Sequence, residues 1–218
     1  MTEWQNFVNV EEDLIAANVK LAKENEEIFN KRDLMVYEIM GNIGSGKTKI
    51  IGKLVEHLKD KYKIFVINGD CATDIDAERI KSHGAETIQI NTGKECHLDA
   101  FTIRPVFNKI PKDVNLCFIE QVGNMICPAD FPLGAKHRTV VFEITNGPYI
   151  VRKHPFIFAI TNIVFINKVD IAEYVDMDKP ARDKLKEDIN KINKNVKVIF
   201  GSAKTGEGIE ELISAMDL

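Results

Sequence analysis

The chain has 218 residues, a length that suits one α/β domain with a full hydrophobic core. Hydrophobic residues make up 44% and charged residues 28%, as in ordinary globular proteins, and a net charge of −4 gives no reason to expect nucleic acid or an anionic membrane as a partner. No apolar stretch is long enough to span a bilayer and no secretory pattern opens the chain, so we expect a cytoplasmic protein whose four cysteines stay reduced.

The first predicted element is an amphipathic helix over residues 10–30. Its apolar side chains recur at intervals of three and four residues among many charges, at Val10, Leu14, Ala17, Leu21 and Ile28. We therefore expect residues 1–32 to form an N-terminal helix packed on the domain, and residues 33–218 to form the domain itself.

A predicted strand from Leu34 to Met40 leads into a glycine-rich segment, and a predicted helix over 49–61 follows it. The segment fits the phosphate-loop pattern GxxxxGK(S/T) and consists of Gly41, Asn42, Ile43, Gly44, Ser45, Gly46, Lys47 and Thr48. Backbone N–H groups and the helix N-terminus bind phosphate in such a loop. We expect Lys47 to contact the outer phosphates during catalysis and the Thr48 hydroxyl to ligate Mg²⁺.

The second predicted strand, 64–67, ends at Asn68-Gly69-Asp70, and a polar helical segment around 76–80 comes next. One of the two acidic residues Asp70 and Asp76 is expected to complete the Mg²⁺ shell or to position the attacking water. We favour Asp76 for this catalytic and metal-binding role. An ordinary solvated turn is the alternative for both.

Glu120 follows a buried strand predicted over 114–119. A carboxylate at a strand end beside a phosphate loop is the Walker B arrangement, so Glu120 is predicted to bind Mg²⁺ and to support catalysis. Further strands are predicted at 88–90, 139–144, 163–166 and 196–200, and further helices at 180–192 and 208–216. This alternation predicts an α/β fold with a mainly parallel central sheet flanked by helices, and ligands at the carboxyl ends of the strands.

Two segments near the C-terminal end predict guanine binding. Asn167, Lys168 and Asp170 fit the pattern NKxD directly after the strand 163–166. The Asp170 carboxylate can accept two N–H donors from one guanine edge, which adenine does not offer, while Asn167 and Lys168 hold and cover the base. The last guanine-contacting loop is matched by Ser202, Ala203 and Lys204. Together with the phosphate loop, these segments predict a P-loop GTPase that converts GTP to GDP and phosphate.

Cys96, His97 and Cys127 are the candidate ligands of a second metal ion. Two thiolates and an imidazole suit Zn²⁺ or Ni²⁺. The cysteines show no CxxC spacing, so buried free thiols and a surface histidine are the alternative interpretation of the spacing alone. Cys117 lies inside an apolar strand and is expected to belong to the core.

The ordered motifs together resemble the HypB family, the nickel-incorporation GTPases that help mature nickel–iron hydrogenases. The resemblance covers nearly the whole chain and is most specific at residues 92–100 and 120–130. It implies a GTP-dependent homodimer of the SIMIBI class that uses GTP or GDP and Mg²⁺, with Cys96, His97 and Cys127 holding Ni²⁺ or Zn²⁺ at the subunit interface. It also implies two partners, a hydrogenase maturation protein and the hydrogenase large subunit.

Two segments depart from the family pattern. Gln121 stands where the family has Asn, so we expect a longer amide beside the γ-phosphate region, and Thr-Asn-Gly-Pro-Tyr at 145–149 replaces a Thr-Glu-Gly-type segment. Both changes bear on the hydrolysis rate and on dimer-linked switching, and the Gln121 change keeps open a nucleotide-gated metal-binding module with little hydrolysis. A urease-type nickel accessory GTPase and an ATP-dependent kinase are further alternatives. The blocks around Cys96 and Cys127 argue against the first, and the guanine-reading segment argues against the second.

Overall fold

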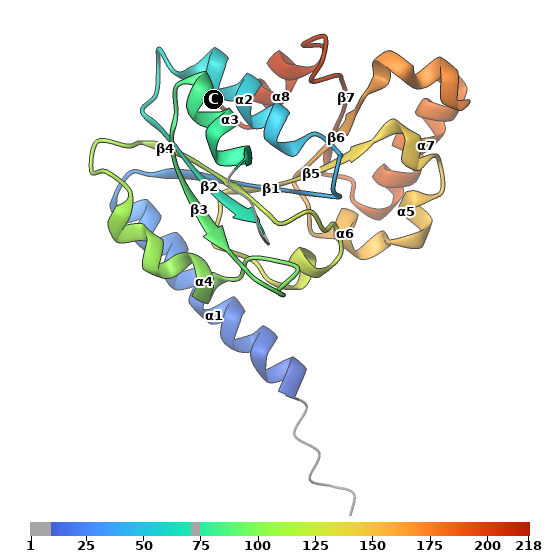
Figure 1. Cartoon of the computed structure of the whole chain (residues 1–218). Coiled ribbons are helices and arrows are strands. Elements are labelled where there is room, and N and C mark those ends of the chain that lie inside the picture. Colours follow the sequence, from blue (N-terminus) through green and yellow to red (C-terminus); the bar gives the residue numbers. More distant parts are fainter. Residues whose placement is uncertain (1–9, 71–74) are drawn as a thin grey trace, which may run out of the picture.

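The computed structural model describes residues 10–70 and 75–218, with side chains from Glu12 to Asp70 and from Glu78 onward. Within these residues, seven strands form one sheet in which all neighbours are parallel, in the order β3-β2-β4-β1-β5-β6-β7 (Figure 1). The strands are β1 (Met35–Gly41), β2 (Ile64–Asp70), β3 (Glu86–Asn91), β4 (Leu116–Glu120), β5 (His137–Glu143), β6 (Ile163–Asn167) and β7 (Lys197–Phe200).

Helices cover both faces of this sheet (Figure 1). The α-helices are α1 (Val10–Lys31), α2 (Lys47–Leu58), α3 (Ile75–His83), α4 (Ala100–Ile103), α5 (Ile150–Lys153), α6 (Pro155–Ala159), α7 (Lys179–Ile192) and α8 (Ile209–Ala215). Short 3-10 segments are η1 (Arg104–Lys109), η2 (Cys127–Asp130), η3 (Ile144–Asn146) and η4 (Val169–Val175). One face carries α2, α3 and α8, whereas the other carries α1 and α4 over one half and α5, α6 and α7 over the other.

The central strands are buried on both faces, which explains their nearly continuous apolar runs. In β1, Tyr37 and Ile39 pack in the core beneath α2 and α8, while Val36 and Met40 belong to clusters on the opposite face. The predicted fold class is confirmed, and the sheet is parallel at every pairing that the described residues make.

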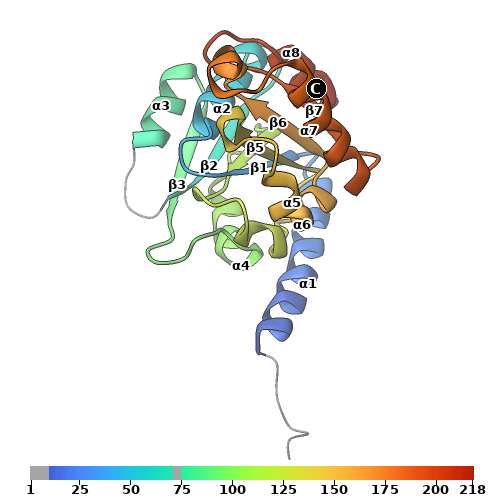
Figure 2. The same ribbon diagram turned by 90° about the vertical axis from the view of Figure 1, so that its right-hand side faces the viewer.

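Helix α1 has the predicted extent but packs through a different face. Its most buried positions, each at most 4% exposed, are Asn18, Ala22, Asn25 and Phe29. Leu14 is 57% exposed and Ala17 is also exposed, so the prediction that these two residues face the domain is wrong. The side chain of Val10 lies outside the described part. The N-terminal half of α1 extends beyond the sheet, as Figure 1 and Figure 2 both show.

The face that packs is selected by backbone groups of two loops. Asn18 accepts a hydrogen bond from Ala100 N at 2.7 Å and donates one to Pro132 O at 2.9 Å. The helix backbone also passes so close to Gly134, which has φ 92°, that a Cβ there would lie 2.3 Å from Ala22 O. The spacing of apolar residues along the helix cannot predict such a contact, because polar side chains and a glycine make it.

Among the helices that the structure describes, none combines the length and the apolar composition needed to cross a membrane.

Candidate functional site

The glycine-rich segment forms the loop between β1 and α2, at the edge of the sheet where the strands have their carboxyl ends. Lys47 Nζ donates hydrogen bonds to Gly41 O at 3.0 Å and to Asn42 O at 3.2 Å. Only 7% of Lys47 is exposed, so its ammonium group is directed into the loop. Loops of this pattern surround phosphate with backbone N–H groups and one lysine.

Thr48 and Glu120 meet beside this loop. The Thr48 hydroxyl donates to Glu120 Oε1 at 2.7 Å, and Asn68 Nδ2 donates to Glu120 Oε2 at 2.9 Å. Asn68 and Glu120 are register partners on β2 and β4, which is why both side chains reach the same point. Hydroxyl and carboxylate oxygens are ligands that Mg²⁺ prefers, so the donor atoms of Thr48 and Glu120 fit this ion.

The structure describes the two aspartates considered for the same Mg²⁺ ion to different extents. Asp70 ends β2, and its carbonyl oxygen accepts a hydrogen bond from Thr92 N at 2.9 Å. Asp76 belongs to α3, but its side chain lies outside the described residues. The preference for Asp76 therefore stays a prediction.

Asn167 ties three segments of the predicted nucleotide site together. Its Nδ2 donates to Ser45 O at 2.7 Å, and its Oδ1 accepts from Lys168 N at 2.8 Å and from Ala203 N at 2.9 Å. The amide lies against Gly46, where φ is 95° and a Cβ would collide with it. One buried side chain thus links the phosphate loop to both segments predicted to bind guanine.

Asp170 is oriented by the last of these segments. The Ser202 hydroxyl donates to Asp170 Oδ1 at 2.6 Å, and Lys204 Nζ lies 3.7 Å from Oδ2. The hydrogen bond from Ser202 is the main cause that lowers the pKa of Asp170, so this carboxylate is ionised at neutral pH. Lys168 has a left-handed backbone with φ 67° and forms an ion pair with Glu143 at the end of β5. A fixed, ionised acceptor is what a pair of guanine N–H donors requires.

Cys96, His97 and Cys127 come from two loops that meet at the same edge of the sheet. Cys96 precedes α4, and Cys127 opens η2 after β4. A side-chain hydrogen bond with Cys127, together with burial, raises the pKa of the Cys96 thiol. Cys96 Sγ lies 3.8 Å from His97 Nδ1, and Asn124 Nδ2 lies 3.1 Å from Cys127 Sγ. The structure therefore brings the three candidate ligands into one neighbourhood.

These three side chains are not arranged as a finished metal site. Across the described residues, no group of three or more His, Cys, Asp or Glu side chains could hold an ion as it stands. The His97 ring is stacked on Phe131, with ring centroids 4.2 Å apart. The metal-ligand assignment stays a prediction that rests on the donor atoms. Cys117, in contrast, is buried in the core, where burial raises the pKa of its thiol to about 12.

The expectation for Gln121 is wrong. Its amide does not lie beside the phosphate loop: Nε2 donates to Glu38 Oε1 at 2.8 Å and to Leu98 O at 3.1 Å, and Oε1 accepts from Leu98 N at 2.8 Å. The physical reason is the alternation of side chains along an extended chain. Because Glu120 points toward Thr48, the next residue points to the other side.

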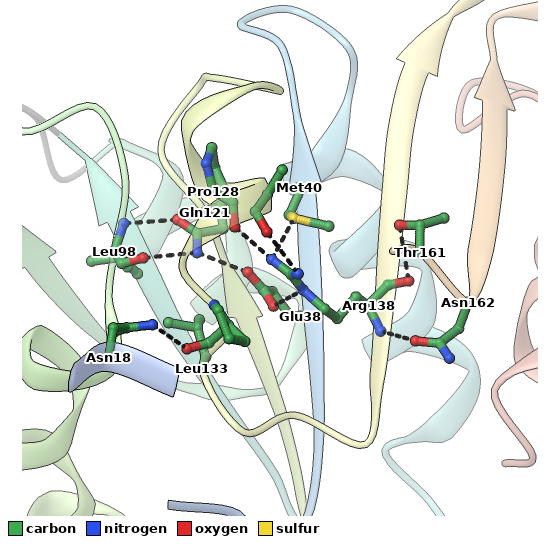
Figure 3. A network of polar contacts seen from close by, with 12 residues as sticks. Asn18, Glu38, Met40, Leu98, Gln121, Pro128, Leu133, Arg138, Thr161 and Asn162 are labelled. Atoms are coloured by element: carbon green, nitrogen blue, oxygen red, sulfur yellow. Dashed lines mark hydrogen bonds and ion pairs between the residues drawn. The ribbon is translucent and has the colours of Figure 1, made fainter. Parts of the chain in front are cut away.

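Two residues that contact this region were missed in the sequence. Glu38 lies in the middle of β1, is wholly buried, and accepts a hydrogen bond from Arg138 Nε at 2.8 Å (Figure 3). The signal in the sequence was a carboxylate within an otherwise apolar strand. It predicts a buried, positively charged partner, because a buried charge needs one. Nothing local identifies Arg138 as that partner.

The comparisons with known proteins also point to a nucleotide-binding domain. Residues 35–200 match the family description "CobW/HypB/UreG, nucleotide-binding domain". The chain is 42% identical over 211 residues to the probable hydrogenase maturation factor HypB of Methanocaldococcus jannaschii, which covers 96% of this chain and 94% of that protein. It is similar to the crystal structure of hydrogenase maturation factor HypB from Archaeoglobus fulgidus, with a TM-score of 0.85 and 41% identity over 93% of this chain and 98% of that one. HypB from Helicobacter pylori in complex with nickel gives a TM-score of 0.83 and 30% identity over 91% of this chain and 92% of that one.

Proposed function

The chain belongs to the HypB family of the CobW/HypB/UreG nucleotide-binding domains, and from this premise we propose that it is a GTP-hydrolysing metallochaperone that binds nickel and delivers it during nickel–iron hydrogenase maturation. The observation that carries the proposal is that the Cys96–His97 loop and the loop of Cys127 meet at the edge of the sheet that holds the phosphate loop, where the His97 ring stacks on Phe131. The recipients would be a maturation partner and the hydrogenase large subunit.

The nucleotide part of the proposal uses the phosphate loop and the strand ends beside it. Lys47 compensates phosphate charge, while Thr48, Glu120 and Asp76 are the proposed ligands of Mg²⁺. When bound there, Mg²⁺ would neutralise charge that develops on the phosphates of GTP. Selection of guanine is assigned to Asp170, which Ser202 orients.

A GTP-dependent homodimer is the second part of the proposal. Ile43 in the phosphate loop is 84% exposed, and Ile126, next to Cys127, is 51% exposed. Exposed apolar side chains beside a functional site are typical of a surface that a second protein covers. A second subunit would supply a second set of the same sulfur and nitrogen donors, which suit nickel and also zinc.

The nickel assignment is tested with three cysteine variants. Cys96→Ala and Cys127→Ala should each remove most of the nickel affinity, measured by isothermal titration, and leave GDP affinity unchanged. Cys117→Ala is the matched control, because its thiol is buried in the core and should affect stability alone. Unchanged nickel binding in both site variants would remove the metallochaperone proposal and leave a GTPase.

A nucleotide-gated module with little hydrolysis remains the alternative to this proposal. Glu38 and Leu98 hold the Gln121 amide away from the phosphate loop, so this amide is not placed to contact the γ-phosphate. Release of phosphate from GTP without an acceptor supports the enzyme. Nickel affinity that depends on bound nucleotide, without phosphate release, supports the module.

A further inference from the structure

A buried polar network connects the two loops that carry the candidate nickel ligands (Figure 3). On one side, Gln121 forms hydrogen bonds with both backbone groups of Leu98, the residue directly after His97. This double contact works like a strand pairing and fixes the backbone of the loop at that point. The Leu98 side chain is buried against Gly69, so both the backbone and the side chain of Leu98 hold the loop in place.

On the other side, Arg138 holds the loop that contains Cys127. Its guanidinium donates to Pro128 O at 2.5 Å and to Ala129 O at 3.2 Å, and Pro128 directly follows Cys127. The planar guanidinium makes these contacts and the bond to Glu38 at the same time, which a lysine cannot do.

Glu38 joins the two halves of the network. One carboxylate oxygen accepts from Gln121 and the other from Arg138, each at 2.8 Å. The Glu38 side chain is 0% exposed and that of Arg138 is 12% exposed. A buried ion pair adds little to stability compared with apolar packing, so a role in fixing the positions of its neighbours accounts better for its presence.

We propose that Gln121, Glu38 and Arg138 are positioning residues that set the placement of the Cys96–His97 loop relative to the Cys127 loop, and that Gln121 passes changes at the nucleotide site to both loops. Gln121 is the residue next to Glu120, whose carboxylate contacts Thr48 of the phosphate loop. A shift of this strand end that moves Glu120 also moves the amide that holds Leu98. This inference rests on the proposed function, because it concerns the same nickel ligands.

The first test replaces Gln121 with methionine, which keeps the length of the side chain and removes its hydrogen bonds. Nickel affinity of the full-length Gln121→Met protein should fall about 10- to 100-fold, the usual effect of losing a group that orients metal ligands. The near-ultraviolet sulfur-to-nickel charge-transfer band should weaken or shift, while GDP affinity stays at the parent value. Stability alone would not change this spectrum.

The matched control is Asn193→Met. Asn193 also ties backbone carbonyls together, donating to Thr161 O at 2.9 Å and Phe158 O at 3.2 Å, but it belongs to the opposite end of the sheet. This variant should lower the thermal midpoint and keep nickel affinity and the charge-transfer band unchanged.

The second test is Arg138→Lys, which keeps a positive charge beside Glu38 and loses the fork that holds Pro128 and Ala129. It remains informative where the loss of Gln121 prevents folding. In both variants, the ratio of nickel affinities measured with a non-hydrolysable GTP analogue and with GDP should move toward one.

The outcomes separate this inference from the proposed function. Folded Gln121→Met and Arg138→Lys proteins that keep the parent nickel affinity, spectrum and nucleotide ratio would overturn the inference, provided that Cys96→Ala loses nickel. If Cys96→Ala and Cys127→Ala also keep nickel, the proposed function fails instead, and the inference fails with it.

Discussion

The Asp170 carboxylate shows how neighbouring side chains orient one residue of the predicted guanine site. Ser202 donates to one of its oxygens at 2.6 Å, and the Lys204 ammonium lies 3.7 Å from the other. Both contacts favour the ionised form and restrict its orientation. Asn167 acts in a different way, because all its hydrogen bonds go to backbone groups of the loops around it. One residue is expected to read the base, and the other holds the loops.

The first residue-scale prediction concerns Asp170→Asn. This variant should lose about 2–3 kcal/mol of the preference for guanine over adenine nucleotides, because one of two acceptor oxygens becomes a misplaced donor. Competition binding with GDP and ADP measures the change. Asp176→Asn, at a nearby exposed position, is the control for the loss of one charge and should keep the preference. Equal affinity of the parent protein for both nucleotides would contradict the assignment of Asp170 to guanine selection.

The second residue-scale prediction separates Lys47 from Thr48. Both Lys47→Ala and Thr48→Ala should abolish hydrolysis, since one removes charge compensation on phosphate and the other removes a Mg²⁺ ligand. Lys47→Ala should weaken nucleotide binding with or without Mg²⁺. Thr48→Ala should weaken GTP binding most in the presence of Mg²⁺ and have little effect on GDP without it. Titrations across Mg²⁺ concentrations that do not distinguish the two variants would contradict these roles.

At the scale of elements, α1 is attached to the sheet domain by polar contacts as well as by Phe29. Asn25 is wholly buried, donates to Ala100 O and Leu133 O at 3.3 Å each, and accepts from Arg104 Nη1 at 2.8 Å. These carbonyls belong to segments just after the loops of the candidate nickel ligands. The helix therefore supports those loops from outside, opposite the internal network of Gln121.

The element-scale prediction is that Asn25→Ala lowers the free energy of unfolding by about 1–3 kcal/mol, because two buried carbonyls and a guanidinium lose their partner. Chemical denaturation measures it. Asn30→Ala, on an exposed position of the same helix, serves as the matched control and should have almost no effect. Equal losses in the two variants would show that the buried hydrogen bonds of Asn25 are not what holds α1.

At the scale of the whole molecule, the end of α8 and the residues after it cover the edge where the strands begin. Tyr37 Oη donates to Met216 O at 2.7 Å, and Lys197 Nζ donates to Ala215 O at 2.8 Å. His137 Nε2 lies 3.3 Å from Asp217 Oδ2. These contacts connect β1, β5 and β7 to one short stretch of chain, at the end of the sheet opposite the nucleotide site.

The whole-molecule prediction follows from His137. Burial, aided by Lys136 and Lys197, lowers the pKa of His137 even though Asp217 opposes the shift. Below the pKa of an unfolded histidine, about 6.5, the unfolded chain therefore binds more protons than the folded one. The free energy of unfolding should fall as pH decreases from 7 to 5, and His137→Gln should make this fall shallower. Denaturation curves at several pH values test it, and an identical slope in parent and variant would contradict it.

The sequence by itself determined the fold class, the order of the strands along the chain and the family. The physical reason is that these features are local. A buried parallel strand needs a continuous apolar run, as at 163–166, and a phosphate loop needs its glycines and lysine at set intervals within one segment. The structure and the comparisons confirm both the fold and the family. The roles of the individual site residues remain predictions, from Lys47, Thr48 and Glu120 at the phosphate loop to Asp76, Asp170 and the candidate ligands Cys96, His97 and Cys127.

The tertiary structure alone decided which way several side chains point. The Gln121 amide faces Leu98 and Glu38 because the strand alternates, and α1 packs through Asn18 and Asn25 because two distant loops present backbone groups to it. The ion pair between Glu38 and Arg138 joins residues 100 positions apart in the chain. Such contacts depend on which loops meet at one edge of the sheet, and no local period in the sequence carries that information.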